Sequence, residues 1–170
     1  MRRVRLGGER VMCVSGGRGS GTGSYFHWMP ISRHDVGFLL AVASRRWNSQ
    51  LEALFTARGF PEVRASYGAL LVPLFEEDGL RMGDLAQRAR LSKQTVTTMA
   101  RLLERDGLIE RTQDATDKRA TIIRLSVRGR KLRPVAEAVR AEMERALVKR
   151  LTRGGVDDLR AALTELADAG

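Results

Sequence analysis

The sequence predicts a mainly α-helical protein that carries one small β-hairpin near its middle. Apolar residues recur at helical spacing on both sides of this middle segment, and "ATIIRLS" (120–126) alternates like a strand after the turn-like residues "TQDATD" (112–117). At 170 residues, the chain suits one domain with or without an extension. Its hydrophobic fraction of 43% and charged fraction of 29% are typical of a globular, water-soluble protein.

The first part of the chain differs from the rest in composition. Residues 1–30 are rich in Gly, Ser and Arg without a helical or strand period, so we expect a flexible tail. No apolar run follows its basic start, and none elsewhere reaches the roughly 20 residues of a membrane span, which predicts a cytoplasmic protein. Cys13 is the only cysteine, so no intrachain disulfide can form, and an oxidant-sensing role for this thiol is a weak alternative.

Two helices are expected next. The first begins after Asp35 and ends at Gly59 and Pro61. Its apolar residues recur at helical spacing: Val36, Leu39, Leu40, Ala43, Trp47, Leu51, Leu54 and Phe55. The second covers about residues 64–77, and Pro73 within it removes a backbone hydrogen bond and predicts a kink.

The middle segment predicts a pair of short helices and then the hairpin. Met82, Leu85, Ala86 and Ala89 share one face of the first short helix, and Ser92 is placed to cap the second. In the second, Val96, Met99, Leu102 and Leu103 are expected to point inward. The outer face is expected to be a polar, cationic stripe without acidic residues: Gln94, Thr97, Thr98, Arg101 and Arg105. Gly107 ends this helix, and "LIER" and "ATIIRLS" form the two strands.

Two helices are expected at the C-terminal end, separated by the breaking residues "TRGG" (152–155). The apolar stripe of the first is Leu132, Val135, Val139, Met143, Ala146, Leu147 and Leu151, and that of the second is Val156, Leu159, Leu163 and Leu166. One chain has difficulty covering these faces together with the first helix. The alternatives are packing within one monomer and a two-fold symmetric homodimer, and we favour the dimer.

Charge is concentrated in the middle of the chain. Residues 81–133 contain fourteen basic and six acidic residues, a net charge of +8, whereas 31–80 and 134–170 each carry −1. This distribution predicts a local surface for a polyanion, with an ordinary solvated surface as the alternative. A helix fits the DNA major groove and a basic hairpin tip can reach the minor groove, so double-stranded DNA is the expected polyanion.

The segment 82–132, "MGDLAQRARLSKQTVTTMARLLERDGLIERTQDATDKRATIIRLSVRGRKL", resembles the MarR family of winged helix-turn-helix transcriptional regulators. The resemblance implies a single domain over 31–170, with a winged helix-turn-helix unit at 64–126 and dimerisation helices at 31–60 plus 127–170. It implies a homodimer that acts as a repressor on a palindromic operator and is released by a small aromatic or phenolic effector. The sequence departs from the family at Arg81, where members often have a Ser or Thr cap, and at Pro73.

Site residues follow from the resemblance position by position. The positions expected at the major groove or its phosphates are Ser92, Lys93, Gln94, Thr95, Thr98 and Arg101, and those expected at the wing are Asp117, Lys118 and Arg119. Phosphate attraction is also expected from Arg124, Arg128, Arg130 and Lys131. Arg45, Arg46, Trp47 and Tyr67 are candidates to line an effector pocket, with core and surface packing as the preferred alternative.

Other classes of function have less support. The tail segment "GGRGSGTGS" (16–24) lacks the GK[ST] ending of a phosphate-binding loop and follows no apolar strand. His27 and His34 are the only histidines, so neither a catalytic triad nor a Cys/His metal site is expected, and no cofactor is predicted. We therefore expect that this protein is not an enzyme. Non-specific architectural binding of DNA or RNA remains the alternative, because basic charge alone supports it.

Overall fold

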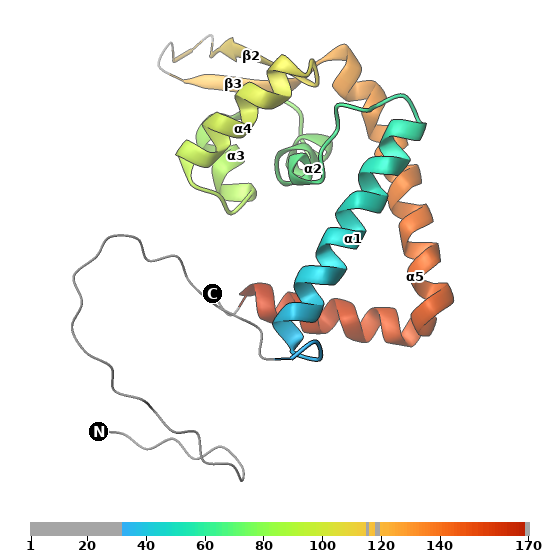
Figure 1. Cartoon of the computed structure of the whole chain (residues 1–170). Coiled ribbons are helices and arrows are strands. Elements are labelled where there is room, and N and C mark those ends of the chain that lie inside the picture. The colour runs from blue at the N-terminus through green and yellow to red at the C-terminus, as the bar shows by residue number, and fades with distance from the viewer. Residues whose placement is uncertain (1–31, 115, 118–119, 169–170) are drawn as a thin grey trace, which may run out of the picture.

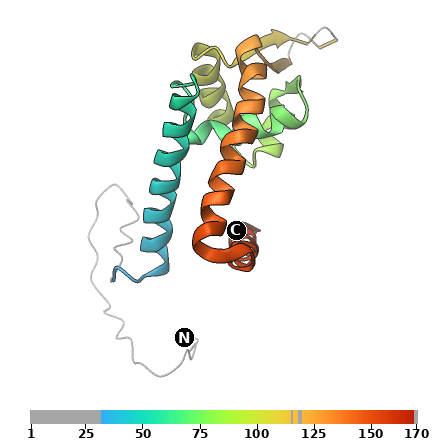
Figure 2. The ribbon, with the colours of Figure 1, turned by 90° about the vertical axis from the view of Figure 1, so that its right-hand side faces the viewer.

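The computed structural model describes residues 32–114, 116–117 and 120–168. The tail expected at 1–30, with Cys13, and the predicted wing residues Lys118 and Arg119 lie outside these ranges. Figures 1 and 2 show a small unit of short helices and strands at one end of the molecule, from which α1 and the first half of α5 extend side by side. No helix in the described ranges is long and apolar enough to cross a membrane.

The first two predicted helices are present. Helix α1 spans Val36–Ala57, and the carboxylate of Asp35 accepts hydrogen bonds from the amides of Gly37 and Phe38 at its start. The segment 64–77 forms a 3₁₀ turn, η1 (Ala65–Tyr67), followed by α2 (Gly68–Glu76). Helix α2 continues through Pro73, so the segment divides at Gly68 and not at the proline.

The helix pair and its turn also agree with the sequence. Helix α3 spans Met82–Arg88 and α4 spans Lys93–Arg105, and Gly107, at φ 72°, adopts the left-handed conformation that follows the end of α4. The prediction that Leu102 points inward is wrong, because it is 37% exposed. Ala100, which is fully buried, occupies the inner face in its place, since it lies four residues after Val96 and three before Leu103.

The sheet contains one strand more than the predicted two-stranded hairpin. Strands β2 (Ile109–Gln113) and β3 (Thr121–Leu125) pair antiparallel as expected, with Arg111 opposite Ile123. A two-residue strand, β1 (Leu80–Arg81), pairs with the other edge of β3, which gives the order β1-β3-β2. The sequence signal for β1 was too short to detect, because two residues show no alternation.

Helix α5 spans Val127–Asp168 and changes direction once. Thr152 has φ 62° and ψ 171°, which is not helical, so the break expected at "TRGG" is confirmed at its first residue. The two halves run in different directions in Figure 1.

A single core joins these elements. Its buried side chains come from all the helices and strands, including Phe55 of α1, Leu70 of α2, Val96 and Leu103 of α4, and Leu132 of α5. The sheet contributes Ile109 and Ile123. Burial of these large apolar side chains stabilises the winged unit, which comprises η1, α2, α3, α4 and the sheet, and attaches both long helices to it.

The start of α5 approaches the turn after α4 very closely. The Oγ atom of Ser126 accepts from the amide of Gly129 and donates to the carbonyl of Gly107. A Cβ atom added at Gly129 would lie 2.0 Å from the carbonyl oxygen of Leu108. Only glycine therefore fits at position 129 without displacing the backbone.

We predict that Gly129→Ala lowers the free energy of unfolding by about 3 kcal/mol or more, because the new methyl group collides with backbone that cannot rotate away. Gly83→Ala is the matched control, since its Cβ would meet no atom within 4 Å. Chemical denaturation of both variants measures the difference. Equal stability of the two variants would contradict the close approach at Gly129.

Candidate nucleic-acid interface

Helix α4 has a polar, exposed outer face and an apolar, buried inner face. Val96, Ala100 and Leu103 are fully buried on its inner face. The six positions of α4 and its cap that the sequence selected are all exposed: Ser92, Lys93, Gln94, Thr95, Thr98 and Arg101. The helix thus presents a polar surface to solvent while its apolar side is held in the core.

Local hydrogen bonds organise the first turns of α4. The Oγ atom of Ser92 accepts from the amide of Thr95 at 3.1 Å, which confirms the predicted cap. The hydroxyl of Thr97 donates to the carbonyl of Lys93, and that of Thr98 donates to the carbonyl of Gln94. Because each hydroxyl proton is used within the helix, the outward lone pairs of Thr97 and Thr98 remain available as acceptors.

The cations of this face are not equivalent. Within the described ranges, Lys93 and Arg101 form no side-chain hydrogen bond or ion pair, so both are available to a partner. Arg105 differs, because its Nε donates to Asp106 Oδ1 at 2.9 Å. The expected stripe without acidic neighbours therefore ends at Arg101. Glu104 lies beside it and pairs with Arg111 of β2.

A buried tyrosine holds the C-terminal end of α4. Tyr67 of η1 is 3% exposed, and its hydroxyl donates to Asp106 Oδ2 at 2.5 Å. Burial and then the Asp106 carboxylate raise the pKa of Tyr67, whereas the bonds from Arg105 and Tyr67 lower the pKa of Asp106. The contact joins the segment after α1 to the end of α4.

The hairpin turn is organised by Asp114, which the sequence identified only as a turn residue. Its Oδ1 accepts from the amide of Thr116 at 2.8 Å and from the hydroxyl of Thr116 at 2.7 Å, and Oδ2 accepts from the Arg81 guanidinium. These bonds hold the pKa of Asp114 well below its usual range. Asp117 is exposed beside this turn. Its predicted bracing of Arg119 lies outside the described residues.

An open hollow of about 470 Å³ separates the hairpin from the starts of α3 and α4. Its lining residues are Arg81, Met82, Gly83, Asp84, Lys93, Thr97, Arg111, Ala120 and Thr121. Three of these are basic, Arg81, Lys93 and Arg111, and one is acidic. Arg81 and Arg111 pair with Asp114 and Glu104, so among the described residues Lys93 is the lining cation without an ion pair.

Two cations that were expected to attract phosphate instead form hydrogen bonds with other residues of the fold. Arg128 donates to Glu62 Oε1 and to the Gly59 carbonyl and lies 4.6 Å from the centre of the Phe60 ring. The bond from Arg128 also lowers the pKa of Glu62. Arg130 donates to the Leu125 carbonyl at 2.6 Å. Arg128 and Arg130 therefore brace α5 against its neighbours.

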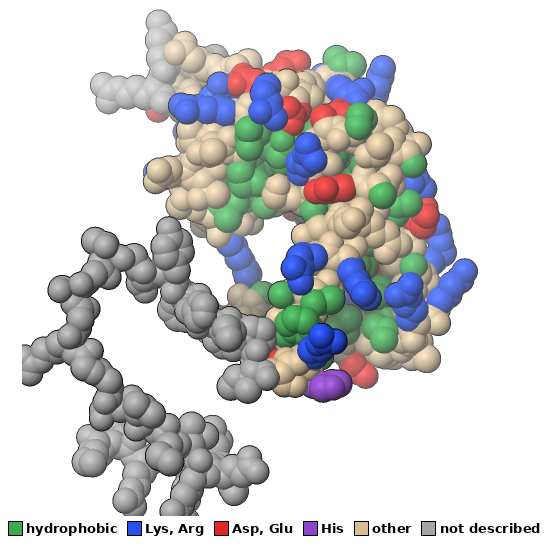
Figure 3. Space-filling view, viewed as in Figure 1, with side chains coloured by type: hydrophobic (Ala, Val, Ile, Leu, Met, Phe, Trp, Pro, Cys, Tyr) green, Lys and Arg blue, Asp and Glu red, His purple; other side chains and the backbone are tan. Residues whose placement is uncertain are grey.

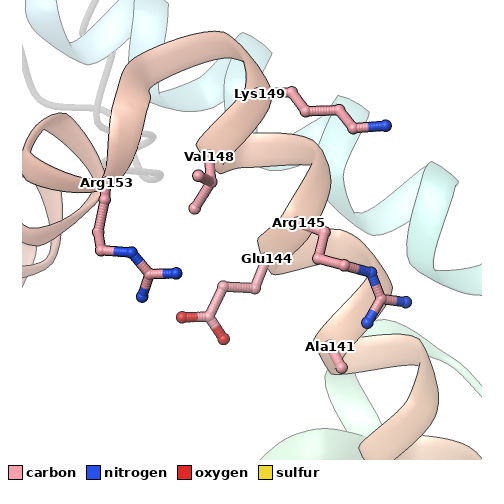
Figure 4. Close-up of a pocket in the computed structure, with 6 residues that line it drawn as sticks. All are labelled: Ala141, Glu144, Arg145, Val148, Lys149 and Arg153. Carbon is pink, nitrogen blue, oxygen red and sulfur yellow. The ribbon is translucent and has the colours of Figure 1, made fainter.

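The four candidates for an effector pocket lie in different environments. Arg45, Arg46 and Trp47 are exposed on α1, whereas Tyr67 is buried and bonded to Asp106. Another hollow, of about 490 Å³, lies along α5 beside its bend and is lined by other residues. Figure 4 shows Glu144 and Arg153 facing this hollow, with Lys149 directed away from it. Within the described ranges, no group of three or more His, Cys, Asp or Glu residues could hold a metal ion.

Helix, turn, helix and a sheet with a hairpin define a winged helix-turn-helix protein, and comparisons with known proteins show what this unit is similar to. Residues 66–121 match the MarR family. The HTH-type transcriptional repressor YetL of Bacillus subtilis (strain 168) is 32% identical over 89 residues, which are 51% of this chain and 52% of YetL. The alignment thus spans about half the length of this relative.

Solved structures share the fold over most of the chain. The S. aureus MepR–DNA complex is 27% identical with a TM-score of 0.67, and covers 80% of this chain and 98% of its own. A probable transcriptional regulator from Pseudomonas aeruginosa is 28% identical with a TM-score of 0.63, and covers 78% of this chain and 97% of its own. The match to the MarR family thus covers residues 66–121, and the similarity to these solved structures extends over about four fifths of the chain.

We predict that acid destabilises the protein through Asp106 and Asp114. A carboxyl whose pKa is lowered by folding stabilises the native state above its unfolded pKa of about 4, and this contribution is lost as the pH falls toward the native pKa. The free energy of unfolding should therefore decrease from pH 5 to pH 3, and less steeply in Asp106→Asn and Asp114→Asn. Denaturation at several pH values tests this, and variants that follow the wild-type slope would refute it.

Proposed function

We propose that this protein is a sequence-specific, double-stranded DNA-binding transcriptional regulator. The observation that carries the proposal is the outer face of α4, which is polar, exposed and uncovered by any described part of the chain. Its side chains include Gln94 and Arg101, which suit hydrogen bonding to base edges in the major groove. In this proposal α4 is the recognition helix, and β2, β3 and their turn form the wing, with Lys118 and Arg119 near the minor groove.

The proposed assembly is a homodimer formed by the long helices. Large apolar side chains are exposed at the start of α1 and along the second half of α5: Val36, Leu39, Leu40, Leu159, Leu163 and Leu166. Figure 3 shows hydrophobic side chains gathered at this end of the molecule. Exposed apolar side chains of this kind favour contact with a second copy. Residues 31–60 plus 127–170 are therefore the proposed dimerisation region, and 64–126 the winged helix-turn-helix unit.

The regulatory mechanism extends this proposal. Because YetL is described as a repressor and MepR was solved on DNA, repression at a palindromic operator is the proposed mode. A small aromatic or phenolic effector, bound near Arg45, Arg46, Trp47 or Tyr67, would favour a dimer whose recognition helices no longer match the groove spacing. This is a non-enzymatic role in the cytoplasm.

Non-specific architectural binding of DNA or RNA is the alternative. The net charge of +8 over residues 81–133 supports it as well as it supports regulation. The two proposals differ in sequence preference, because a regulator binds its operator about a thousandfold or more tightly than random DNA.

We predict that the purified full-length protein selects an inverted repeat from a random duplex pool at near-physiological salt. Half-sites should lie about one helical turn apart, since a two-fold dimer places its recognition helices in successive major grooves. Gln94→Ala should reduce preference for particular bases more than total affinity. Tight binding without any recovered motif would favour the architectural alternative, and absence of binding would refute both.

A further inference from the structure

Arg81 stands at the start of α3, but its side chain binds another part of the fold. It is the N-cap residue of α3, yet its side chain makes no capping hydrogen bond. Instead, Nε and Nη2 of its guanidinium donate to Asp114 Oδ2 at 2.9 and 2.5 Å. The residue that departs from the usual Ser or Thr cap thus binds a carboxylate at the far end of β2.

Asp114 connects this guanidinium to the turn of the wing. Its side chain is buried, and its second oxygen, Oδ1, accepts from both the amide and the hydroxyl of Thr116 and, at 3.4 Å, from the amide of Asp117. The backbone amide of Asp114 donates to the carbonyl of Ala120, one step beyond the paired residues of β2 and β3. One carboxylate therefore holds the beginning of the turn and Arg81 at the same time.

The contact crosses the whole sheet. Arg81 lies on β1 opposite Ile122, whereas Asp114 follows β2, and β3 separates the two edge strands. Two strand spacings amount to about 10 Å, which a long arginine side chain can span and a serine or threonine cannot. Because β1 has only two residues, few backbone bonds attach it to β3. The ion pair supplies a second attachment between the start of α3 and the wing.

We propose that Arg81 is a positioning residue for DNA binding: through Asp114 it fixes the wing turn relative to α3 and α4. This inference rests on the proposed function. DNA contacts by the recognition helix and the wing must form together, so a wing held at one distance from α4 loses less freedom on binding. The acceptor side of the contact, Asp114, cannot bind phosphate, because it is itself an anion.

The competing role for Arg81 is direct phosphate contact. Its side chain is half exposed and lines the hollow between the hairpin and the helix starts. The two roles predict different salt dependences. Affinity falls as salt rises, and loss of one phosphate contact makes the slope of log affinity against log salt about 0.9 less steep. Loss of a positioning contact lowers affinity and leaves this slope unchanged.

The test compares Arg81→Ala, Asp114→Asn and the double variant in the full-length protein, on the inverted repeat recovered by selection. Each single variant should weaken binding on the order of tenfold, and the double variant should be no weaker than either, because both remove the same coupling. Arg140→Ala is the control for charge loss, since it removes an exposed arginine paired with Glu144 of α5. A lowered salt slope in Arg81→Ala, with unchanged or tighter binding by Asp114→Asn, would overturn the proposal.

A second measurement needs no DNA. In the free protein, Arg81→Ala should speed exchange of the Thr116 amide, measured by NMR, while Arg81→Lys should restore part of the protection. Unchanged exchange in Arg81→Ala would overturn the positioning role even if DNA binding falls. If the wild-type protein selects no DNA, the proposed function fails and with it the DNA role of Arg81. Faster exchange in that case would still establish the contact between Arg81 and the turn.

Discussion

One-sided burial of α4 is the constraint on which the rest of the structure depends. Val96, Ala100 and Leu103 have no exposed surface, so the helix cannot rotate about its axis without exposing apolar area to water. Its core contacts come from α2, α3 and β2, and these elements therefore set its direction. The polar side chains on the opposite face need no partner within the chain, and they are available to a second molecule.

Polar contacts at the edges of this core relate α4 to its surroundings. Tyr67 holds the end of α4 through Asp106, and Arg81 joins the start of α3 to the wing turn through Asp114. Both contacts link segments that are distant in the sequence, and each involves a side chain that is largely buried. Tyr67, which lies at the end of η1 after the loop that follows α1, therefore connects this segment to the end of α4.

Much of the architecture was predictable because its signals are local. Periodic apolar residues, the Ser92 cap, Gly107 and the break after Leu151 each act within a few positions, and the structure confirms them. Strand β1 and the role of Asp114 were not predictable, since each depends on a distant partner, whereas the exposure of Leu102 follows from its local spacing to Val96 and Leu103. Arg128 was assigned to an open cationic surface for the same reason, because its partner Glu62 is distant in the sequence. The partners of Arg105 and Arg130 are Asp106 and the Leu125 carbonyl, which are near in the sequence, but these contacts depend on side-chain directions that only the fold shows.

Methylation protection of guanine N7 on selected DNA tests the central claim most directly, because N7 faces the major groove. If α4 of each subunit enters that groove, protected guanines will lie in two successive major grooves on one face of the duplex, about one helical turn apart. Gln94→Ala should leave both protected regions in place, since the helix still enters. Saturating binding without N7 protection would contradict the account, because the protein would then contact only the backbone or the minor groove.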